Sequence, residues 1–152
     1  MGKLKHKNDK KQKGIKIYTI GYQSFSIDSF INTLVKEGIK TIIDVRNTPF
    51  SYKYGFSKSW LIKFLSDAGI KYYSFPELGV EKEYRKEHFS SYYTDKLKTK
   101  KEKIGEVTNI IKSKPSALMC FEKNPQECHR GILAHKIKEF TSLEISHIGG
   151  TK

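Results

Sequence analysis

Apolar positions along residues 15–152 follow two alternating spacings, which predict strands and helices in turn. Short runs of β-branched and aromatic residues that end at glycine, proline or a polar residue predict strands. Longer stretches with apolar residues three and four positions apart predict helices. The predicted strands are residues 15–21, 40–45, 70–75, 116–121 and 143–148. The predicted helices run from Ser24 or Ser26 to about Glu37, and over residues 57–69, 90–113 and 125–140.

This alternation predicts a single α/β domain over residues 15–152. The run "KTIIDV" (40–45) is apolar at successive positions, as in strands that are buried on both faces of a parallel sheet. Right-handed crossovers cover both faces of such a sheet with helices. We therefore expect a Rossmann-like three-layer fold, with a mostly parallel sheet of about five strands. Residues 76–89 are polar, aromatic and poorly periodic, and they predict a long loop of the kind that is usually functional or mobile.

The chain is strongly basic, with a net charge of +13 from 29 Lys and Arg against 16 Asp and Glu. Residues 1–14 form a basic tail that is expected to be disordered, and residues 1–13 contribute +5, which leaves +8 on the rest. This excess favours an anionic ligand such as a nucleotide or nucleic acid, although the tail alone is also typical of a solubilising arm. No stretch is long and apolar enough for a membrane span or a secretory signal, so we expect a cytoplasmic protein with no membrane partner. The oligomeric state stays open.

Polar residues follow the predicted strands, at the edge where parallel sheets bind ligands. They are Gly21 and Tyr22, Asp44 and Arg46, Glu77, and Cys120 and Glu122. Asp44 is the unusual member, because a carboxylate inside an apolar run needs hydrogen bonds or a cation to offset its desolvation. Its expected partner is Arg46 or Arg130. Two interpretations stay open, namely a structural ion pair or a pair that orients an anionic or polar substrate.

Both cysteines lie in "CFEKNPQECHR" (120–130), which predicts the start of a helix. Asn124 is a good N-cap, Pro125 suits the first helical position, and Glu127 can complete a capping box. The free amide groups at such a helix start favour an anion or a thiolate nearby.

Cys128 falls at the fourth position of this predicted helix, beside His129 and Arg130, and such surroundings lower the pKa of a thiol. Cys120 is closer to the strand and is interpreted as a small buried hydrophobic residue. In a cytoplasmic protein we expect thiols rather than a structural disulfide, although the short spacing leaves a redox pair open.

No cofactor and no metal are expected from the motifs. Cys120, Cys128 and His129 are not spaced like the paired CxxC units of a closed zinc site, and no other histidine is an obvious fourth ligand. The chain contains no GxGxxG, GxxxxGK[ST] or GxSxG motif. Dinucleotide-binding, P-loop and serine-hydrolase functions therefore have no direct support.

The segment 76–93 interleaves aromatic and basic residues, among them Tyr84 and Arg85. Aromatic faces beside cations can stack with a base and pair with its phosphate. The same aromatic residues could instead pack the loop onto the sheet. Glu77, directly after the third predicted strand, is a candidate general acid or base.

The order of these motifs resembles one family from about residue 16 to the C-terminus. The segments "YTIGYQSFSIDSFINTLVKEGIKTIIDVRNTPFS", "FSKSWLIKFLSDAGIKYYSFPELG" and "ALMCFEKNPQECHR" are similar to the domain of unknown function 488 family. The resemblance implies an α/β domain whose motif residues meet at one end of the sheet, and it implies no settled reaction. Tyr22 stands where many relatives carry histidine. The residues that match the motifs are Gly21, Asp44, Arg46, Pro49, Glu77, Leu78, Gly79, Cys120, Glu122, Cys128, His129 and Arg130.

Three hypotheses of function follow from these patterns. The leading one is an enzyme that acts on a nucleotide, a nucleoside or a nucleic-acid base, with carboxylates as reactive groups and arginines as anion-binding groups. The others are a non-catalytic nucleic-acid binding module and a thiol-based sulfurtransferase or redox protein. The candidate catalytic residues are Asp44, Glu77, Glu122, Cys128 and His129, and the candidate substrate-binding residues are Gly21, Tyr22, Arg46, Tyr84, Arg85, Cys120 and Arg130.

Overall fold

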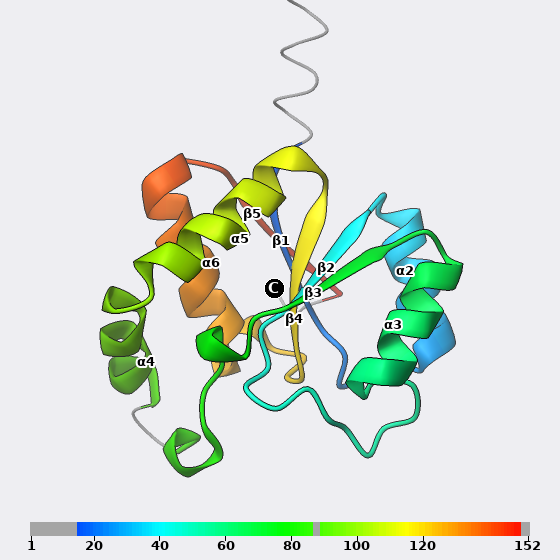
Figure 1. The fold of residues 1–152 in the computed structure, drawn as a ribbon, viewed down its shortest axis with the longest axis horizontal. Helices are drawn as coiled ribbons and strands as arrows, with labels where there is room; N and C mark the ends of the chain where they lie inside the picture. Colours follow the sequence, from blue (N-terminus) through cyan, green and yellow to red (C-terminus); the bar gives the residue numbers. More distant parts are fainter. Residues whose placement is uncertain (1–14, 87–88, 150–152) are drawn as a thin grey trace, which may run out of the picture.

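The computed structural model, which describes residues 15–86 and 89–149, confirms the predicted α/β fold with one parallel five-stranded sheet in the order β3-β2-β4-β1-β5 (Figure 1). The strands are β1 (Ile17–Gly21), β2 (Thr41–Asp44), β3 (Lys71–Ser74), β4 (Ser116–Cys120) and β5 (Ile145–Ile148). The helices are α2 (Ile27–Lys36), α3 (Lys58–Asp67), α4 (Phe89–Lys98), α5 (Lys101–Ser113) and α6 (His129–Thr141). Each predicted strand is confirmed, with ends that differ by at most two residues.

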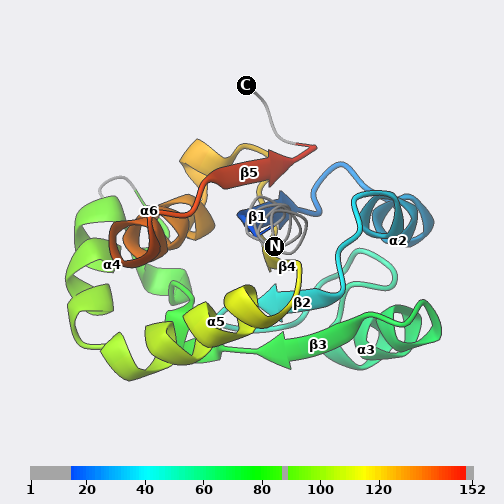
Figure 2. The ribbon, with the colours of Figure 1, turned by 90° about the horizontal axis from the view of Figure 1, so that it is seen from above.

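Helices cover both faces of the sheet, as Figure 2 shows, with α2 and α3 on one face and α5 and α6 on the other. Successive side chains of a strand point to opposite faces, so each buried strand contributes to both cores. Ile42 packs with α2 and α3, whereas its neighbour Ile43 packs against the opposite layer. This two-sided burial explains the continuous apolar run at β2. Within the described part of the chain, no helix has the length and apolar character needed to cross a bilayer.

Local signals set the ends of the first two helices. Ser26 caps α2, where its hydroxyl accepts a hydrogen bond from the Ser29 backbone N–H at 3.1 Å. Gly38 (φ 74°) and Gly69 (φ 77°) follow α2 and α3 in the left-handed conformation that glycine adopts without a steric penalty.

The single helix predicted over residues 90–113 is wrong, because α4 and α5 are separate helices. The backbone N–H groups of Thr99 and Lys100 bond three residues back and so close α4. The break lets Leu97 and Ile104, on different helices, both reach the same core. The basic run at 96–103 has no apolar periodicity, so the spacing could not reveal this turn.

The long loop predicted after β3 contains two 3-10 turns, Pro76–Leu78 and Lys82–Tyr84. The Tyr93 hydroxyl donates a hydrogen bond to the Leu78 carbonyl at 2.6 Å and so holds the first turn against α4. This loop, the loop after β2 and the loop after β4 gather at the same edge of the sheet, at the bottom of Figure 1. The predicted tail, residues 1–14, lies outside the described residues.

Candidate functional site at the carboxyl edge of the sheet

A cleft of about 880 Å³ opens at the carboxyl edge of the sheet. Its walls come from the loops that follow β1, β2, β3 and β4, as expected for a ligand site of a parallel sheet. The side chains in the walls carry more positive than negative charge. The basic residues of the walls are Arg46, Lys53, Lys82, Arg85 and Lys86, and the acidic residues are Glu122 and Glu127.

Asp44 and Arg46 form an ion pair below the cleft. The Arg46 guanidinium donates two hydrogen bonds to the Asp44 carboxylate, from Nε at 2.9 Å and from the second terminal nitrogen at 2.7 Å. Asp44 is fully buried and Arg46 is 5% exposed. The Tyr72 hydroxyl also donates to the Asp44 carboxylate, and burial together with this charge raises the pKa of Tyr72. The carboxylate is thus enclosed by its partners.

The remaining donors of Arg46 hold the loop after β2. One terminal nitrogen donates to the Tyr22 hydroxyl at 3.2 Å and to the Phe56 carbonyl at 2.6 Å. The Tyr22 ring stacks on Phe56 with a centroid distance of 4.5 Å. Burial would lower the pKa of Arg46, but the Asp44 carboxylate outweighs it and raises the pKa, so the guanidinium stays charged. Arg46 therefore links the ends of β1 and β2 to the wall of the cleft.

Arg130 holds the loop after β4 in a similar way, and it does not pair with Asp44. Its guanidinium donates to the backbone carbonyls of Glu122 and Lys123 and to the Cys120 sulfur at 3.4 Å. Arg130 is fully buried, which lowers its pKa to about 10 and still leaves it charged at neutral pH. The structure thus places this arginine as a support for the loop.

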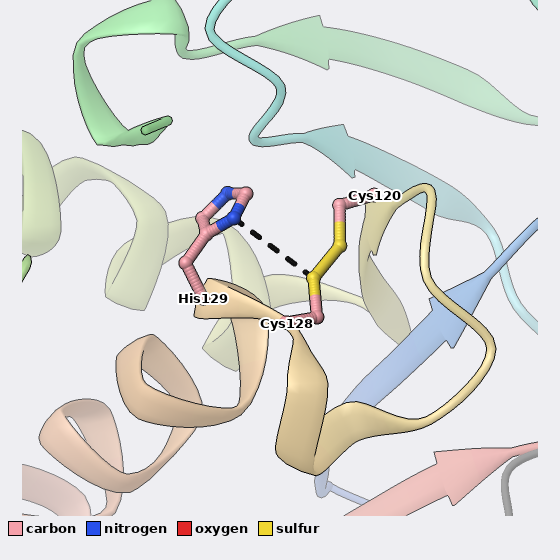
Figure 3. A group of neighbouring side chains, drawn as sticks. All are labelled: Cys120, Cys128 and His129. Carbon is pink, nitrogen blue, oxygen red and sulfur yellow. Dashed lines mark hydrogen bonds between the residues drawn. A yellow bond between two sulfur atoms is a disulfide. The ribbon is translucent and has the colours of Figure 1, made fainter. Parts of the chain in front are cut away.

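The two cysteines, expected as thiols, are joined by a disulfide in the structure (Figure 3). Cys120 ends β4 and Cys128 precedes α6, so the loop between them brings both sulfurs to the cleft edge of the sheet. The expectation of thiols rested on the expected compartment, which gives no information about the distance between two sulfurs. Both cysteines are buried, and Cys120 lines the cleft.

The start of α6 differs from the prediction. Residues Pro125–Glu127 form a 3-10 turn capped by Asn124, and α6 begins one turn later, at His129. Cys128 is therefore the N-cap of α6 and not its fourth residue, and its sulfur accepts a hydrogen bond from the Arg130 backbone N–H at 3.5 Å. The proline favours the start of either helix type, so the sequence could not separate them.

His129 lies beside the disulfide, and its side chain points toward Cys128 in Figure 3. Its Nε2 lies 2.7 Å from the Val45 carbonyl oxygen, and its Nδ1 lies 3.9 Å from the Cys128 sulfur. Because a carbonyl only accepts, the network assigns the proton to Nε2 and leaves Nδ1 without one. Burial lowers the pKa of His129 to about 4, so the ring is neutral at neutral pH.

The residues predicted as site residues divide into two groups. Tyr22, Arg46, Arg85, Cys120, Glu122 and His129 line the cleft. Asp44, Cys128 and Arg130 lie behind its walls, and Gly21 packs against the Glu122 carbonyl. Glu77 lies outside the cleft lining and pairs with Lys103 at 3.6 Å, while the exposed Tyr84 stacks on Tyr92 at 4.0 Å.

Sequence reasoning missed several wall residues of the cleft. Phe50, Tyr52 and Lys53 come from the loop after β2, and Phe121 follows β4. A signal for the first three was present in the sequence. The segment "PFSYKYGF" (49–56) interleaves aromatic and basic residues shortly after a strand, as the segment 76–93 does. Tyr72 also went unnoticed, because its contact with Asp44 depends on the pairing of β2 with β3.

Comparison with models of known protein families gave a match. The family profile described as Domain of unknown function DUF488 matches residues 26–137, well over half of the chain. No curated protein and no solved structure matches. The matched segment includes the ion pair below the cleft, both cysteines and the start of α6. The match confirms the resemblance seen in the motifs, and the chain belongs to the DUF488 family.

Proposed function

We propose that the protein is an enzyme that binds a nucleotide, a nucleoside or a nucleic-acid base in the cleft at the carboxyl edge of the sheet. The observation that carries the proposal is the joint presence of exposed aromatic faces and cations in one cleft. Such a combination suits a ligand with both a flat ring and a phosphate.

The aromatic residues supply surfaces on which a base can stack. Phe50 is 55% exposed, Tyr52 is 97% exposed and Phe121 is 42% exposed, although large apolar side chains normally avoid water. Phe121 meets the buried Tyr22 edge to face with a centroid distance of 5.4 Å, so its ring is held at one side of the cleft. Stacking on such rings contributes about 1 to 3 kcal/mol per base.

The cations supply the complementary contacts to phosphate. Arg46 is committed to Asp44, Tyr22 and the Phe56 carbonyl, so it is a poor phosphate ligand. The exposed Lys82, Arg85 and Lys86 line the cleft from the loop after β3. Arg85 Nε donates to the Val80 carbonyl at 2.9 Å, which orients the guanidinium. These three side chains therefore form the phosphate-binding side of the proposed site.

The candidate reactive groups are those that reach the cleft, namely Glu122 and His129. Glu122 is half-buried at the end of β4, and the neutral His129 ring presents an unprotonated nitrogen. A carboxylate and a neutral imidazole can accept and donate the protons that hydrolytic or transfer reactions on a base require. The enclosed Asp44 acts in this proposal by positioning Arg46.

Binding of mono- and oligonucleotides at low salt tests the proposal. We expect the Lys82→Ala/Lys86→Ala variant to bind at least about tenfold more weakly, with a shallower salt dependence, because it loses two phosphate contacts. Phe121→Ala is expected to bind the nucleotide about fivefold or more weakly, because it loses a surface on which a base can stack. The matched control is Lys63→Ala/Lys112→Ala, which removes the same charge from exposed positions of α3 and α5.

An equal loss of nucleotide affinity in both double variants would show that net charge alone attracts the ligand. No binding of any nucleotide at low salt would exclude the proposed class of ligand. Mass spectrometry of the recovered ligands separates the two nucleic-acid hypotheses. A chemically changed ligand supports the enzyme, whereas tight binding of ligands that are all recovered intact favours the non-catalytic binding module.

The disulfide supports thiol chemistry as a second candidate function. Cys120 lines the cleft, and Cys128 lies at the N-terminus of α6, where the Arg130 backbone N–H points at its sulfur. Such a setting stabilises a thiolate. After reduction, we expect iodoacetamide to modify one cysteine faster in the folded chain than in the urea-unfolded chain. Modification of both cysteines only after unfolding would exclude this function, and the chain has two cysteines, so mass analysis gives the stoichiometry directly.

A further inference from the structure

We propose that reduction of the disulfide turns Cys120, Cys128 and His129 into a binding site for one zinc ion, with its open coordination position toward the cleft. The two sulfurs and one imidazole nitrogen of these residues all lie within 4.8 Å of one another. Their residues come from the end of β4 and the start of α6, so the fold and not the local sequence brings them together.

The distances suit tetrahedral coordination after a small movement. Zinc binds thiolate at about 2.3 Å and imidazole at about 2.0 to 2.1 Å, which puts neighbouring ligand atoms about 3.5 to 3.8 Å apart. The Cys128 sulfur already lies 3.9 Å from His129 Nδ1.

His129 has the orientation of a metal ligand. Metal-binding histidines almost always donate their second ring N–H to a carbonyl or a carboxylate, which fixes the tautomer. His129 Nε2 donates to the Val45 carbonyl at 2.7 Å, and Nδ1 is left facing the Cys128 sulfur. The structural support that a ligand histidine needs is therefore already in place.

The surroundings of the sulfurs also suit a pair of metal-bound thiolates. The Arg130 backbone N–H lies 3.5 Å from the Cys128 sulfur, and the Arg130 guanidinium lies 3.4 Å from the Cys120 sulfur. Donors of this kind stabilise negative charge on sulfur and orient the ligands. Two thiolates neutralise the charge of the zinc ion, so the buried Arg130 meets no added positive charge.

Metal binding then depends on the oxidation state of the pair. An external dithiol reduces the disulfide by giving up two electrons and two protons, becomes a disulfide itself, and leaves two thiols on the protein. Zinc binding displaces both thiol protons. Oxidation re-forms the sulfur–sulfur bond and removes two of the three ligands, so the site is open to zinc only in the reduced protein.

The position left open by the three ligands faces a carboxylate of the cleft. The Glu122 carboxylate lies 3.7 Å from the Cys120 sulfur, and Glu122, Cys120 and His129 all line the cleft. Catalytic zinc sites keep a water in the fourth position, and a nearby carboxylate can take its proton. If the proposed function holds, this inference narrows the reaction to hydrolysis at the bound base or phosphate, with Glu122 as the proton acceptor and His129 as a zinc ligand only.

Cobalt titration of the reduced, metal-free protein under nitrogen tests the site. We expect one Co²⁺ per chain, with the sulfur-to-cobalt charge-transfer absorption and the strong visible bands of tetrahedral coordination, and displacement by one equivalent of Zn²⁺. Cys128→Ser and His129→Gln should each weaken zinc binding by at least about 100-fold, more than the loss typical of outer-shell changes. The control His135→Gln changes an exposed histidine of the same helix and should bind as the unaltered protein does.

Absence of the charge-transfer band in the reduced protein, or a band of full intensity at the same cobalt concentration in Cys128→Ser, would overturn the inference. Equal zinc binding by the oxidised and reduced protein would overturn the dependence on the disulfide. Nucleotide binding is measured separately in the presence of a chelator. A failure of the zinc site therefore leaves the proposed ligand class standing, and a failure of nucleotide binding leaves the metal result standing.

Discussion

Replacing Asp44 by asparagine is expected to lower the free energy of unfolding by about 3 to 5 kcal/mol, because it leaves the buried Arg46 without its counter-charge. The carboxylate accepts three hydrogen bonds from Arg46, two from its guanidinium and one from its backbone N–H, and a fourth from Tyr72. The amide of asparagine has a single acceptor oxygen and cannot accept all four. Urea denaturation followed by circular dichroism measures the change.

The matched control is Asp95→Asn, which breaks an ion pair with Lys98 on the surface of α4. Both partners are more than two-thirds exposed, so the expected change is within about 0.5 kcal/mol. A comparable loss of stability in the two variants would contradict the assignment of Asp44 as the structural centre of the site.

The same proteins decide between the two interpretations of the Asp44–Arg46 pair. Weaker folding with unchanged nucleotide affinity supports a structural ion pair, and lost affinity in a folded variant supports a role in orienting the substrate.

Replacing Gly21 by alanine is expected to cost at least about 3 kcal/mol, because the added methyl group has no space. An ideal Cβ at Gly21 would lie 1.7 Å from the backbone oxygen of Glu122 and 3.0 Å from the Arg130 guanidinium. The obstacle is main chain, so relief requires the loop after β4 to move. Thermal and urea unfolding measure the loss of stability.

Gly105→Ala gives the opposite expectation for the same chemical change. Gly105 lies inside α5, and a Cβ there meets nothing within 4 Å. Alanine should therefore stabilise the protein by about 0.5 to 1 kcal/mol through higher helix propensity. A stable Gly21→Ala protein with an undisturbed cleft would contradict the close approach of β1 to this loop.

The elements of the fold were predictable because each depends on local signals. The apolar run of β2 indicates a strand that is buried on both faces. The glycines after α2 and α3 indicate where each helix ends. The start of α6 was predicted with an error of one turn, because Asn124 and Pro125 suit a 3-10 turn as well as an α-helix. The break between α4 and α5 lies in a solvated basic run, where no apolar spacing marks a change of direction.

The contacts of the candidate site were much less predictable. The sequence identified Asp44 as a carboxylate in need of a partner, but the choice between Arg46 and Arg130 depends on how the loops after β2 and β4 close. The loop after β3 decides that Glu77 lies outside the cleft lining, and the loop after β4 decides that Cys120 meets Cys128. Distances between segments far apart in the chain follow from packing, which a single sequence does not record.

Arg130 has a consequence for how the protein responds to reducing conditions. The loop between Cys120 and Cys128 is held by two cross-links, one covalent and one polar. Arg130 contacts the disulfide sulfurs, but its two hydrogen bonds to the carbonyls of Glu122 and Lys123 do not require the sulfur–sulfur bond. Cleavage of the covalent link therefore leaves the backbone of this loop anchored. Amide hydrogen exchange over residues 121–127 should then change little between the two oxidation states. Reduction therefore changes the reactivity of the two cysteines and leaves the backbone of the loop in place.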